Sequence, residues 1–221
     1  MTAREKLYDA VMRLPIVALT LYFLGREVLG IRGLVAIHPY FGGDWQFLVA
    51  LAARVSVVLF LAVLASFHAS RLRPIGKHAD WKPKIVALLG AFLTYALLLL
   101  PRSAPDALWD SLSTLLIVTG SMASILVVLN LGRSLSIMPE ARKLVTAGPY
   151  RRVRHPLYLA EEIATLGVFL QFRSWQAALL LLVHFYFQIR RMDGEETILA
   201  RTFPEYIEYK QRSFRLVPGL Y

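Results

Sequence analysis

The chain has 221 residues, of which 57% are hydrophobic and 18% are charged, and none is a cysteine. Soluble domains are nearer half apolar and a quarter charged, so a soluble fold is disfavoured, and disulfides, thiolate metal sites and cysteine catalysis are excluded. The net charge is +10, but the basic residues cluster in loops beside apolar segments, which indicates membrane orientation and contact with lipid headgroups rather than nucleic acid.

Four long apolar segments come first, at residues 14–37, 45–67, 85–100 and 108–130. A helix needs about 20 residues to cross the hydrocarbon layer of a bilayer, so each segment predicts a transmembrane helix. The third segment is the shortest and is bounded by Pro83 and Pro101. We therefore expect residues 1–130 to form a bundle of four transmembrane helices.

Charged residues interrupt two of these segments. Arg26 and Glu27 lie near the middle of the first, and Arg54 lies near the middle of the second. Because a lone charge inside a membrane costs several kcal/mol, pairing is favoured, and antiparallel helices would bring Glu27 and Arg54 to similar depth. These residues either lock two helices together or line a polar cavity.

The loops differ in charge. Residues 38–44 contain no Lys or Arg and residues 101–107 contain only Arg102, whereas residues 68–84 and 131–155 are rich in both. Since basic loops are retained in the cytoplasm, we expect the N-terminus, the two basic segments and the C-terminal tail to be cytoplasmic.

The last apolar stretch is divided into residues 157–170 and 176–189. Each arm would be a helix of only ~21 Å, which favours a helical hairpin packed against the first four helices, with both ends cytoplasmic. Gly194 is expected to interrupt the helix, and the tail at 195–221 to form a short helix over the cytoplasmic face. The expected fold is an all-α polytopic membrane protein in which residues 131–221 form a C-terminal core, with a cytoplasmic cofactor-binding cap, in one compact unit with the bundle.

Two polar clusters flank this hairpin. Residues 142–158 offer basic side chains, aromatic rings and a turn, and a helix starting after His155 would present free N–H groups to an anion. In residues 190–196, Arg191 and Glu195 are four apart and share a helix face. A ligand with a carboxylate, an ammonium group and ribose hydroxyls would fit between the clusters.

Simpler interpretations stay open for single residues. Arg151 and Arg152 have the position of lipid anchors, and tyrosines at span ends commonly form an interfacial belt. Glu161 and Glu162 are either general bases or paired carboxylates. The five histidines have no metal-ligand spacing, and no P-loop or GxGxxG motif is present, so neither a metal site nor a Rossmann-type nucleotide site is expected.

The segment LVTAGPYRRVRHPLY, followed by Glu195-Glu196 and FPEYIEYKQR, resembles the isoprenylcysteine carboxyl methyltransferase and phospholipid methyltransferase superfamily of integral membrane enzymes. The resemblance covers residues 130–221 and implies S-adenosylmethionine as the cofactor. It differs at 131–141, where Leu135 or Ser136 is nearest to the family's polar cofactor contact, and in the tail, where Phe203-Pro204-Glu205 replaces a longer motif.

Carried over residue by residue, the resemblance implies Arg191 as the substrate-binding arginine, and Arg191 and Glu195 as the catalytic pair. The cofactor contacts that it implies are Arg142, Lys143, Leu144, Val145, Tyr150, His155, Pro156, Leu157, Tyr158 and Glu195.

In-line methyl transfer needs positioning and a dry site. We expect Glu195 to hold the cofactor's ammonium or ribose, Tyr158 to border the sulfonium, and a lipophilic acceptor to enter from the bilayer. A carboxylate acceptor needs no base and would bind Arg191; an amine or thiol needs one, with Glu162 or Glu196 as candidates. The alternatives are a phospholipid amine N-methyltransferase, an NADPH-dependent membrane reductase of the sterol-reductase type, and a non-enzymatic membrane protein.

Overall fold

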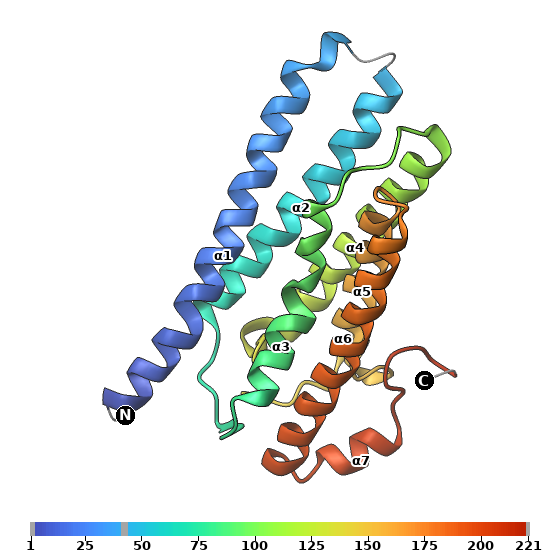
Figure 1. The fold of residues 1–221 in the computed structure, drawn as a ribbon. Helices are drawn as coiled ribbons and strands as arrows, with labels where there is room; N and C mark the ends of the chain where they lie inside the picture. The colour runs from blue at the N-terminus through green and yellow to red at the C-terminus, as the bar shows by residue number, and fades with distance from the viewer. Residues whose placement is uncertain (1–2, 41–43, 220–221) are drawn as a thin grey trace.

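Long apolar helices dominate the fold, as the sequence predicts, and the protein is an all-α polytopic membrane protein. The computed structural model describes residues 3–40 and 44–219, so part of the 38–44 loop lies outside it. The helices run roughly side by side along one axis (Figure 1). The first four long helices are α1 (Ala3–Ala36), α2 (Asp44–Ser70), α3 (Lys82–Phe92) and α4 (Ala107–Leu131).

Among the described residues, four helical stretches are long and apolar enough to cross a membrane: Leu7–Ala36, Asp44–Ser70, Lys82–Leu99 and Ala107–Ser134. They confirm the four predicted spans. The third is an α-helix that tightens into the 3₁₀ helix η2 (Leu93–Leu99) before Pro101. The fourth begins at an N-cap, where the Asp106 carboxylate accepts hydrogen bonds from the backbone of Leu108 and Trp109 at 3.0 and 3.1 Å.

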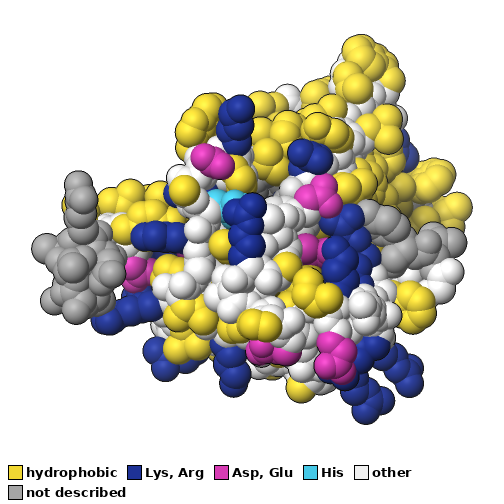
Figure 2. All heavy atoms as spheres, turned by 90° about the horizontal axis from the view of Figure 1, so that it is seen from below, with side chains coloured by type: hydrophobic (Ala, Val, Ile, Leu, Met, Phe, Trp, Pro, Cys, Tyr) yellow, Lys and Arg dark blue, Asp and Glu magenta, His cyan; other side chains and the backbone are white. Residues whose placement is uncertain are grey.

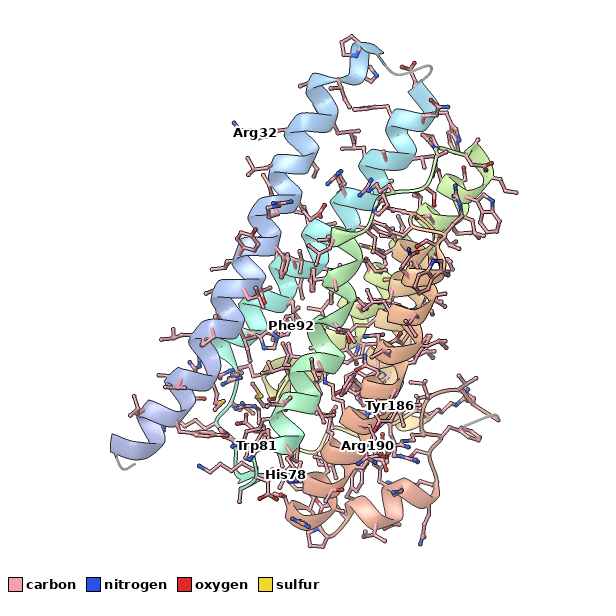
Figure 3. The ribbon with its side chains drawn as sticks, viewed as in Figure 1. Arg32, His78, Trp81, Phe92, Tyr186 and Arg190 are labelled. Atoms are coloured by element: carbon pink, nitrogen blue, oxygen red, sulfur yellow. The ribbon has the colours of Figure 1, made fainter. Side chains whose placement is uncertain are left out.

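The predicted charge pair joins the first two helices. Arg54 Nη1 lies 2.9 Å from Glu27 Oε2, so the two charges compensate each other and link α1 to α2 within the spans. Further along α1, Arg32 points away from the other helices (Figure 3).

The C-terminal hairpin consists of α5 (Pro156–Phe169) and α6 (Trp175–Thr202). The expected interruption at Gly194 is wrong, because α6 continues through it for two more turns. A glycine inside a helix costs only about 1 kcal/mol relative to alanine. The carbonyl oxygen of Gly194 also lies 2.9 Å from His78 Nε2, in the loop before α3. Arg191 and Glu195 therefore lie on one continuous helix.

The two arms of the hairpin pack on different partners. Helix α5 lies mainly against α4, and α6 lies mainly against α3. A Cβ atom at Gly120 of α4 would lie only 2.4 Å from Ala164 N and 2.7 Å from Ala160 O. Small residues thus let α4 and α5 approach backbone to backbone, the usual device of membrane helix pairs.

The lower end of the bundle in Figure 1 collects the connecting segments. Here lie the 3₁₀ helix η4 (Gly148–Arg151), the helix α7 (Tyr206–Gln211) and a two-stranded pairing of β1 (Gly76–Lys77) with β2 (Glu140–Ala141). His78 and Trp81 also lie near this end (Figure 3). Viewed from below, Lys and Arg side chains ring this face with Asp and Glu among them (Figure 2). Of the predicted tail at 195–221, residues 195–202 extend α6, and the predicted short helix is α7.

Candidate functional site

A pocket opens at this lower end, and we call it the basal pocket. Its walls come from the segment that follows α4, from η4, from the first turn of α5, from the lower part of α6 and from α7. The residues that line it are Leu131, Ser134, Leu135, Ser136, Glu140, Arg142, Lys143, Leu144, Val145, Tyr150, Arg154, His155, Leu157, Tyr158, Glu195, Leu199, Tyr206 and Tyr209.

Nearly all the residues that the resemblance assigned to a cofactor lie in this wall. Of those, only Pro156 does not line the basal pocket; it starts α5 instead. Leu135 and Ser136, the nearest equivalents of the family's polar contact, also line it. Tyr150, His155 and Tyr158 of the first polar cluster therefore meet Glu195 of the second at this pocket, whereas Arg191 does not line it.

Local backbone chemistry shapes the entrance to α5. Gly148 adopts a positive φ of 59°, a conformation that side chains disfavour, and Pro149 follows it in η4. His155 is the N-cap residue and Pro156 is in the first turn of α5. Backbone N–H groups in the first turn have no partner within the helix, so the missing N–H of proline costs nothing there. This turn places Tyr150, His155 and Tyr158 toward the pocket.

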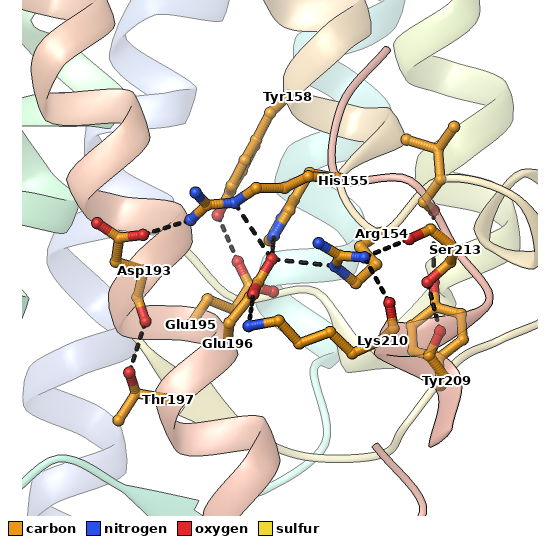
Figure 4. A network of polar contacts seen from close by, with 12 residues as sticks. Arg154, His155, Tyr158, Asp193, Glu195, Glu196, Thr197, Tyr209, Lys210 and Ser213 are labelled. Carbon is orange, nitrogen blue, oxygen red and sulfur yellow. Dashed lines mark hydrogen bonds and ion pairs between the residues drawn. The ribbon is translucent and has the colours of Figure 1, made fainter. Parts of the chain in front are cut away.

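Tyr158 links the two arms of the hairpin. Its hydroxyl donates a hydrogen bond to Glu195 Oε2 at 2.6 Å (Figure 4). Its ring stacks on the His155 imidazole, with ring centroids 5.2 Å apart. The bond from Tyr158 is the only hydrogen bond that the Glu195 carboxylate accepts within residues 3–40 and 44–219. The carboxylate therefore keeps acceptor capacity toward the pocket.

Arg191 lies behind this pair. Its guanidinium carbon is 4.5 Å from the centroid of the Tyr158 ring, which is a cation–π contact. Although the residue is only 6% exposed, it forms no ion pair with a described residue, and its Nε atom has no hydrogen-bond partner there. A buried guanidinium in this state is suited to an anionic ligand, because five N–H donors need acceptors.

Glu196 has a different role from its neighbour. Its carboxylate faces nitrogen atoms of four basic residues at 2.8–3.2 Å: Arg154, His155, Lys210 and Arg215. The first three are labelled in Figure 4. Burial alone would raise the pKa of the Glu196 carboxyl, but the hydrogen bonds from His155, Lys210 and Arg154 outweigh it and hold the pKa well below its usual range. A carboxylate held this way is a poor general base, so the structure disfavours that hypothesis.

Glu162 is also engaged. Its Oε1 atom lies 2.7 Å from His184 Nε2 and accepts a hydrogen bond from Gln188 Nε2 at 3.0 Å. Of the two interpretations of the Glu161-Glu162 pair, the paired one therefore holds for Glu162. The Glu161 carboxylate forms no hydrogen bond or ion pair with a described residue, but it interacts electrostatically with Arg191.

Arg142 forms part of the structural wall. Its guanidinium is buried against Glu140, whose other oxygen accepts a hydrogen bond from Tyr8 at 2.9 Å. It also donates to the carbonyl oxygen of Leu72. Burial lowers the pKa of Arg142 to about 10, so it stays charged at neutral pH. These contacts tie the pocket wall to the ends of α1 and α2.

The tail closes the pocket from below. Tyr209 donates a hydrogen bond to the carbonyl oxygen of Tyr150 at 2.6 Å. Residues 212–215 run beside 152–155, and Phe214 bonds to the backbone on both sides of Val153. Burial raises the pKa of the Tyr150 and Tyr206 phenols and raises that of Tyr209 to about 12, so all three remain neutral.

Glu140, Tyr206 and Tyr209 were not assigned to the site from the sequence. The i, i+3 spacing of the two tyrosines in FPEYIEY puts both on one face of α7, and this signal was available. The sequence contains no such signal for Glu140, because the position of Glu140 depends on the pairing of β2 with a strand more than sixty residues earlier.

The donor set fits an amino-acid nucleoside such as S-adenosylmethionine. Tyr206 and Tyr209 offer neutral aromatic surfaces, the Glu195 carboxylate suits an ammonium group or ribose hydroxyls, and Lys143 suits a carboxylate. Leu157 and other aliphatic side chains in the wall give an apolar surface for the sulfonium, which places no negative charge beside it.

Part of the chain is similar to known proteins. Residues 109–206 match the family model of phospholipid methyltransferases. The nickel-cobalt-cadmium resistance protein NccN of Alcaligenes xylosoxydans xylosoxydans is 32% identical over 82 residues, which are 37% of this chain and 38% of the relative. The cobalt-zinc-cadmium resistance protein CzcN of Cupriavidus metallidurans is 35% identical over 78 residues, 35% of this chain and 36% of the relative. The chain thus spans little more than a third of the length of these relatives.

Proposed function

We propose, from the match of residues 109–206 to the family model of phospholipid methyltransferases, that this integral membrane protein transfers a methyl group from S-adenosylmethionine to a lipophilic acceptor. The basal pocket binds the cofactor. The acceptor enters from the bilayer and presents an anionic group, best a carboxylate as in an isoprenylcysteine, to Arg191. One observation carries the choice of an anion: Arg191 is a buried guanidinium without an ion pair among the described residues.

S-adenosylmethionine, when bound, supplies a methyl group on a positively charged sulfur. Glu195 would hold its ammonium group or ribose, while Tyr158 keeps the Glu195 carboxylate in place through their 2.6 Å hydrogen bond. The Tyr158 ring and the aliphatic wall exclude water from the sulfonium. The positive charge of the sulfonium is lost during transfer, so an environment that does not stabilise this charge in the ground state favours the transition state.

Arg191 orients the acceptor. A carboxylate held by the guanidinium fork would direct one oxygen at the methyl carbon, and the acceptor oxygen forms its bond as the sulfur–carbon bond breaks. A carboxylate is already deprotonated at neutral pH, so this reaction needs no general base. That fits a site in which the Glu162 and Glu196 carboxylates are already engaged.

The family description favours a second acceptor, the amine of a phospholipid. Its phosphate would take the place of the carboxylate at Arg191. An amine must lose a proton, and Glu161 is then the candidate base, because its carboxylate forms no hydrogen bond or ion pair with the described residues and interacts electrostatically with Arg191.

The test is transfer of tritiated methyl from S-adenosylmethionine into a total lipid extract and a panel of lipophilic acids, amines and thiols. A methyl ester releases volatile methanol in alkali, whereas N-methyl and S-methyl products do not. We expect an alkali-labile product. A stable product identifies the amine or thiol alternative, and no labelled product contradicts the proposed function.

Arg191→Lys separates the acceptors further. Lysine keeps the charge but loses the planar fork, so methylation of a carboxylate should fall at least about tenfold, while an amine acceptor held only by charge is affected less. Ligand-induced stabilisation tests the reductase alternative, because only the true cofactor raises the melting temperature. We expect a rise with S-adenosylmethionine and none with NADPH.

A further inference from the structure

A second polar cluster lies beside the basal pocket, between α5 and α6, and we call it the polar bridge. It consists of Glu162, His184 and Gln188, three residues that are only 3–5% exposed. None of the three lines the basal pocket. Buried polar residues between apolar helix arms are costly, so a role is expected of them.

The contacts of the polar bridge form a chain that ends at the site. Glu162 Oε1 meets both His184 Nε2, at 2.7 Å, and Gln188 Nε2, at 3.0 Å. On its other side, Gln188 Oε1 faces Arg191 Nη1 at 3.4 Å. Arg191 in turn stacks on Tyr158. The only hydrogen bond that the Arg191 guanidinium donates to a described residue is the one to Gln188.

Both neighbours impose the same orientation on the amide of Gln188. An ionised carboxylate only accepts hydrogen bonds and a guanidinium only donates them. The amide nitrogen must therefore face Glu162 and the amide oxygen must face Arg191. His184 holds the same carboxylate oxygen from a second direction, which fixes the position of Glu162.

Helix α3 confines the amide and the arginine from the opposite side. A Cβ atom at Gly90 would lie 3.1 Å from Gln188 Oε1 and 3.2 Å from Arg191 Cδ. The aliphatic part of Arg191 and the amide of Gln188 thus have little room to move toward α3. The long, single hydrogen bond to Nη1 leaves the rest of the guanidinium available, and its buried Nε has no partner among the described residues.

We propose that Glu162, His184 and Gln188 are positioning residues, which orient the Arg191 guanidinium toward the anionic group of the acceptor. This inference rests on the proposed function of Arg191. It assigns the three residues to acceptor binding and not to cofactor binding, because none of them lines the basal pocket, whereas Tyr158 and Glu195 do.

The deciding experiment compares acceptor and cofactor affinities in Gln188→Met, which keeps the side-chain length but removes both hydrogen bonds. The probe is N-acetyl-S-farnesylcysteine, a prenylated carboxylate. We expect its KM to rise about tenfold, as loss of a hydrogen bond to a charged group implies. The affinity for S-adenosylhomocysteine, measured by calorimetry, should stay within about twofold of the unaltered protein.

The matched control is Gln171→Met. Gln171 lies in the turn of the same hairpin, and its amide donates a hydrogen bond to Ser113 Oγ at 3.1 Å, away from Arg191. This variant removes a side-chain hydrogen bond between the hairpin turn and α4, so a general loss of hairpin stability would appear in both variants. The acceptor KM should rise only in Gln188→Met.

A double-mutant cycle with Arg191→Lys then tests whether Gln188 changes the acceptor KM through Arg191. If Gln188 acts through Arg191, Gln188→Met should change the acceptor KM less than about twofold in the Arg191→Lys background. Glu162→Gln should give a smaller increase than Gln188→Met, because a neutral amide at 162 can present either end to Gln188.

Three outcomes overturn the inference: an unchanged KM in Gln188→Met, an equal rise in Gln171→Met, or additive effects in the cycle. The same double-mutant cycle can be measured by melting temperature, which requires no enzyme turnover. Additive changes in melting temperature would also overturn the inference. Failure of the unaltered protein to methylate any member of the acceptor panel contradicts the proposed function instead, so the two failures are distinguishable.

Discussion

Adjacent glutamates on α6 have opposite roles. Glu195 accepts one hydrogen bond among the described residues and faces the basal pocket, whereas Glu196 turns toward the tail and faces four basic residues. Successive helical residues are about 100° apart around the axis, so neighbours necessarily face different partners. The Glu-Glu pair therefore combines a ligand contact with an anchor for the tail.

Glu195→Gln should weaken S-adenosylmethionine binding about tenfold, because a charge-assisted contact with the ammonium or ribose is lost. Isothermal calorimetry measures the change. Glu205→Gln, at an exposed position beside α7, is the control and should bind normally. Equal affinity in the two variants would show that Glu195 has only a structural role.

Glu196→Gln should lower the melting temperature at pH 7, since the contacts with Arg154, His155 and Lys210 lose their charge. The lowered pKa of Glu196 gives the pH window. A carboxyl whose pKa is depressed on folding stabilises the protein above its usual value of 4.5, and that stabilisation is lost as the pH falls below it. The difference between the two proteins should be constant from pH 7 to about pH 5 and narrow at lower pH.

Thermal unfolding in detergent at several pH values measures this difference. Glu208→Gln is the control, because Glu208 pairs with Arg212 at the exposed surface and should change little. A difference that grows as the pH falls would contradict the assigned charge state of Glu196.

Single residues could be assigned from the sequence where a local motif fixes them. His155, Tyr158 and Glu195 belong to motifs of fixed spacing, and all three line the basal pocket. The partner of Glu162 could not be assigned, because its contact with His184 depends on the register between two helices. Sequence spacing fixes faces within a helix, but not the offset between helices.

The approach of α4 to α5 positions the first turn of α5 and therefore His155 and Tyr158. Gly120→Ala should displace α5, because the added Cβ would meet backbone atoms of Ala160 and Ala164 that cannot rotate away. We expect a loss of about 1–3 kcal/mol of stability. Weaker cofactor binding should accompany it.

Melting temperature and calorimetry measure the two effects. Gly33→Ala on α1 is the matched control, because nothing lies within 4 Å of a Cβ atom at that position. An unaltered melting temperature in Gly120→Ala would mean that the two helices do not depend on this contact.

The existence of each helix followed from apolar segments and prolines, but the length of α6 did not. Gly194 and the charged run around it suggest an end, yet α6 continues to Thr202 because the following residues are good helix formers and the segment packs against neighbours. Tertiary contacts, which local sequence does not reveal, decided that boundary.

The distribution of basic loops predicts that the basal pocket faces the cytoplasm. The chain has no cysteine, so single introduced cysteines give labelling without background. Ala147 and Ala104 are both exposed, beside η4 and in the loop before α4. In inside-out vesicles a membrane-impermeant maleimide should label Ala147→Cys but not Ala104→Cys.

Right-side-out vesicles serve as the control and should give the opposite pattern. Labelling of both positions in the same vesicles would contradict a topology in which α4 crosses the membrane once. Labelling of Ala104→Cys alone in inside-out vesicles would reverse the orientation while leaving the fold unchanged.

Contacts between α7, the adjoining tail and η4 have a consequence for biosynthesis. Tyr206, Tyr209 and the strand-like pairing of Phe214 beside Val153 come from residues translated after every transmembrane helix. Because a chain emerges from its N-terminal end, the helices can insert before the floor of the basal pocket exists. A nascent chain should therefore be unable to retain the methyl donor until α7 docks, which would make activity depend on translation of the tail.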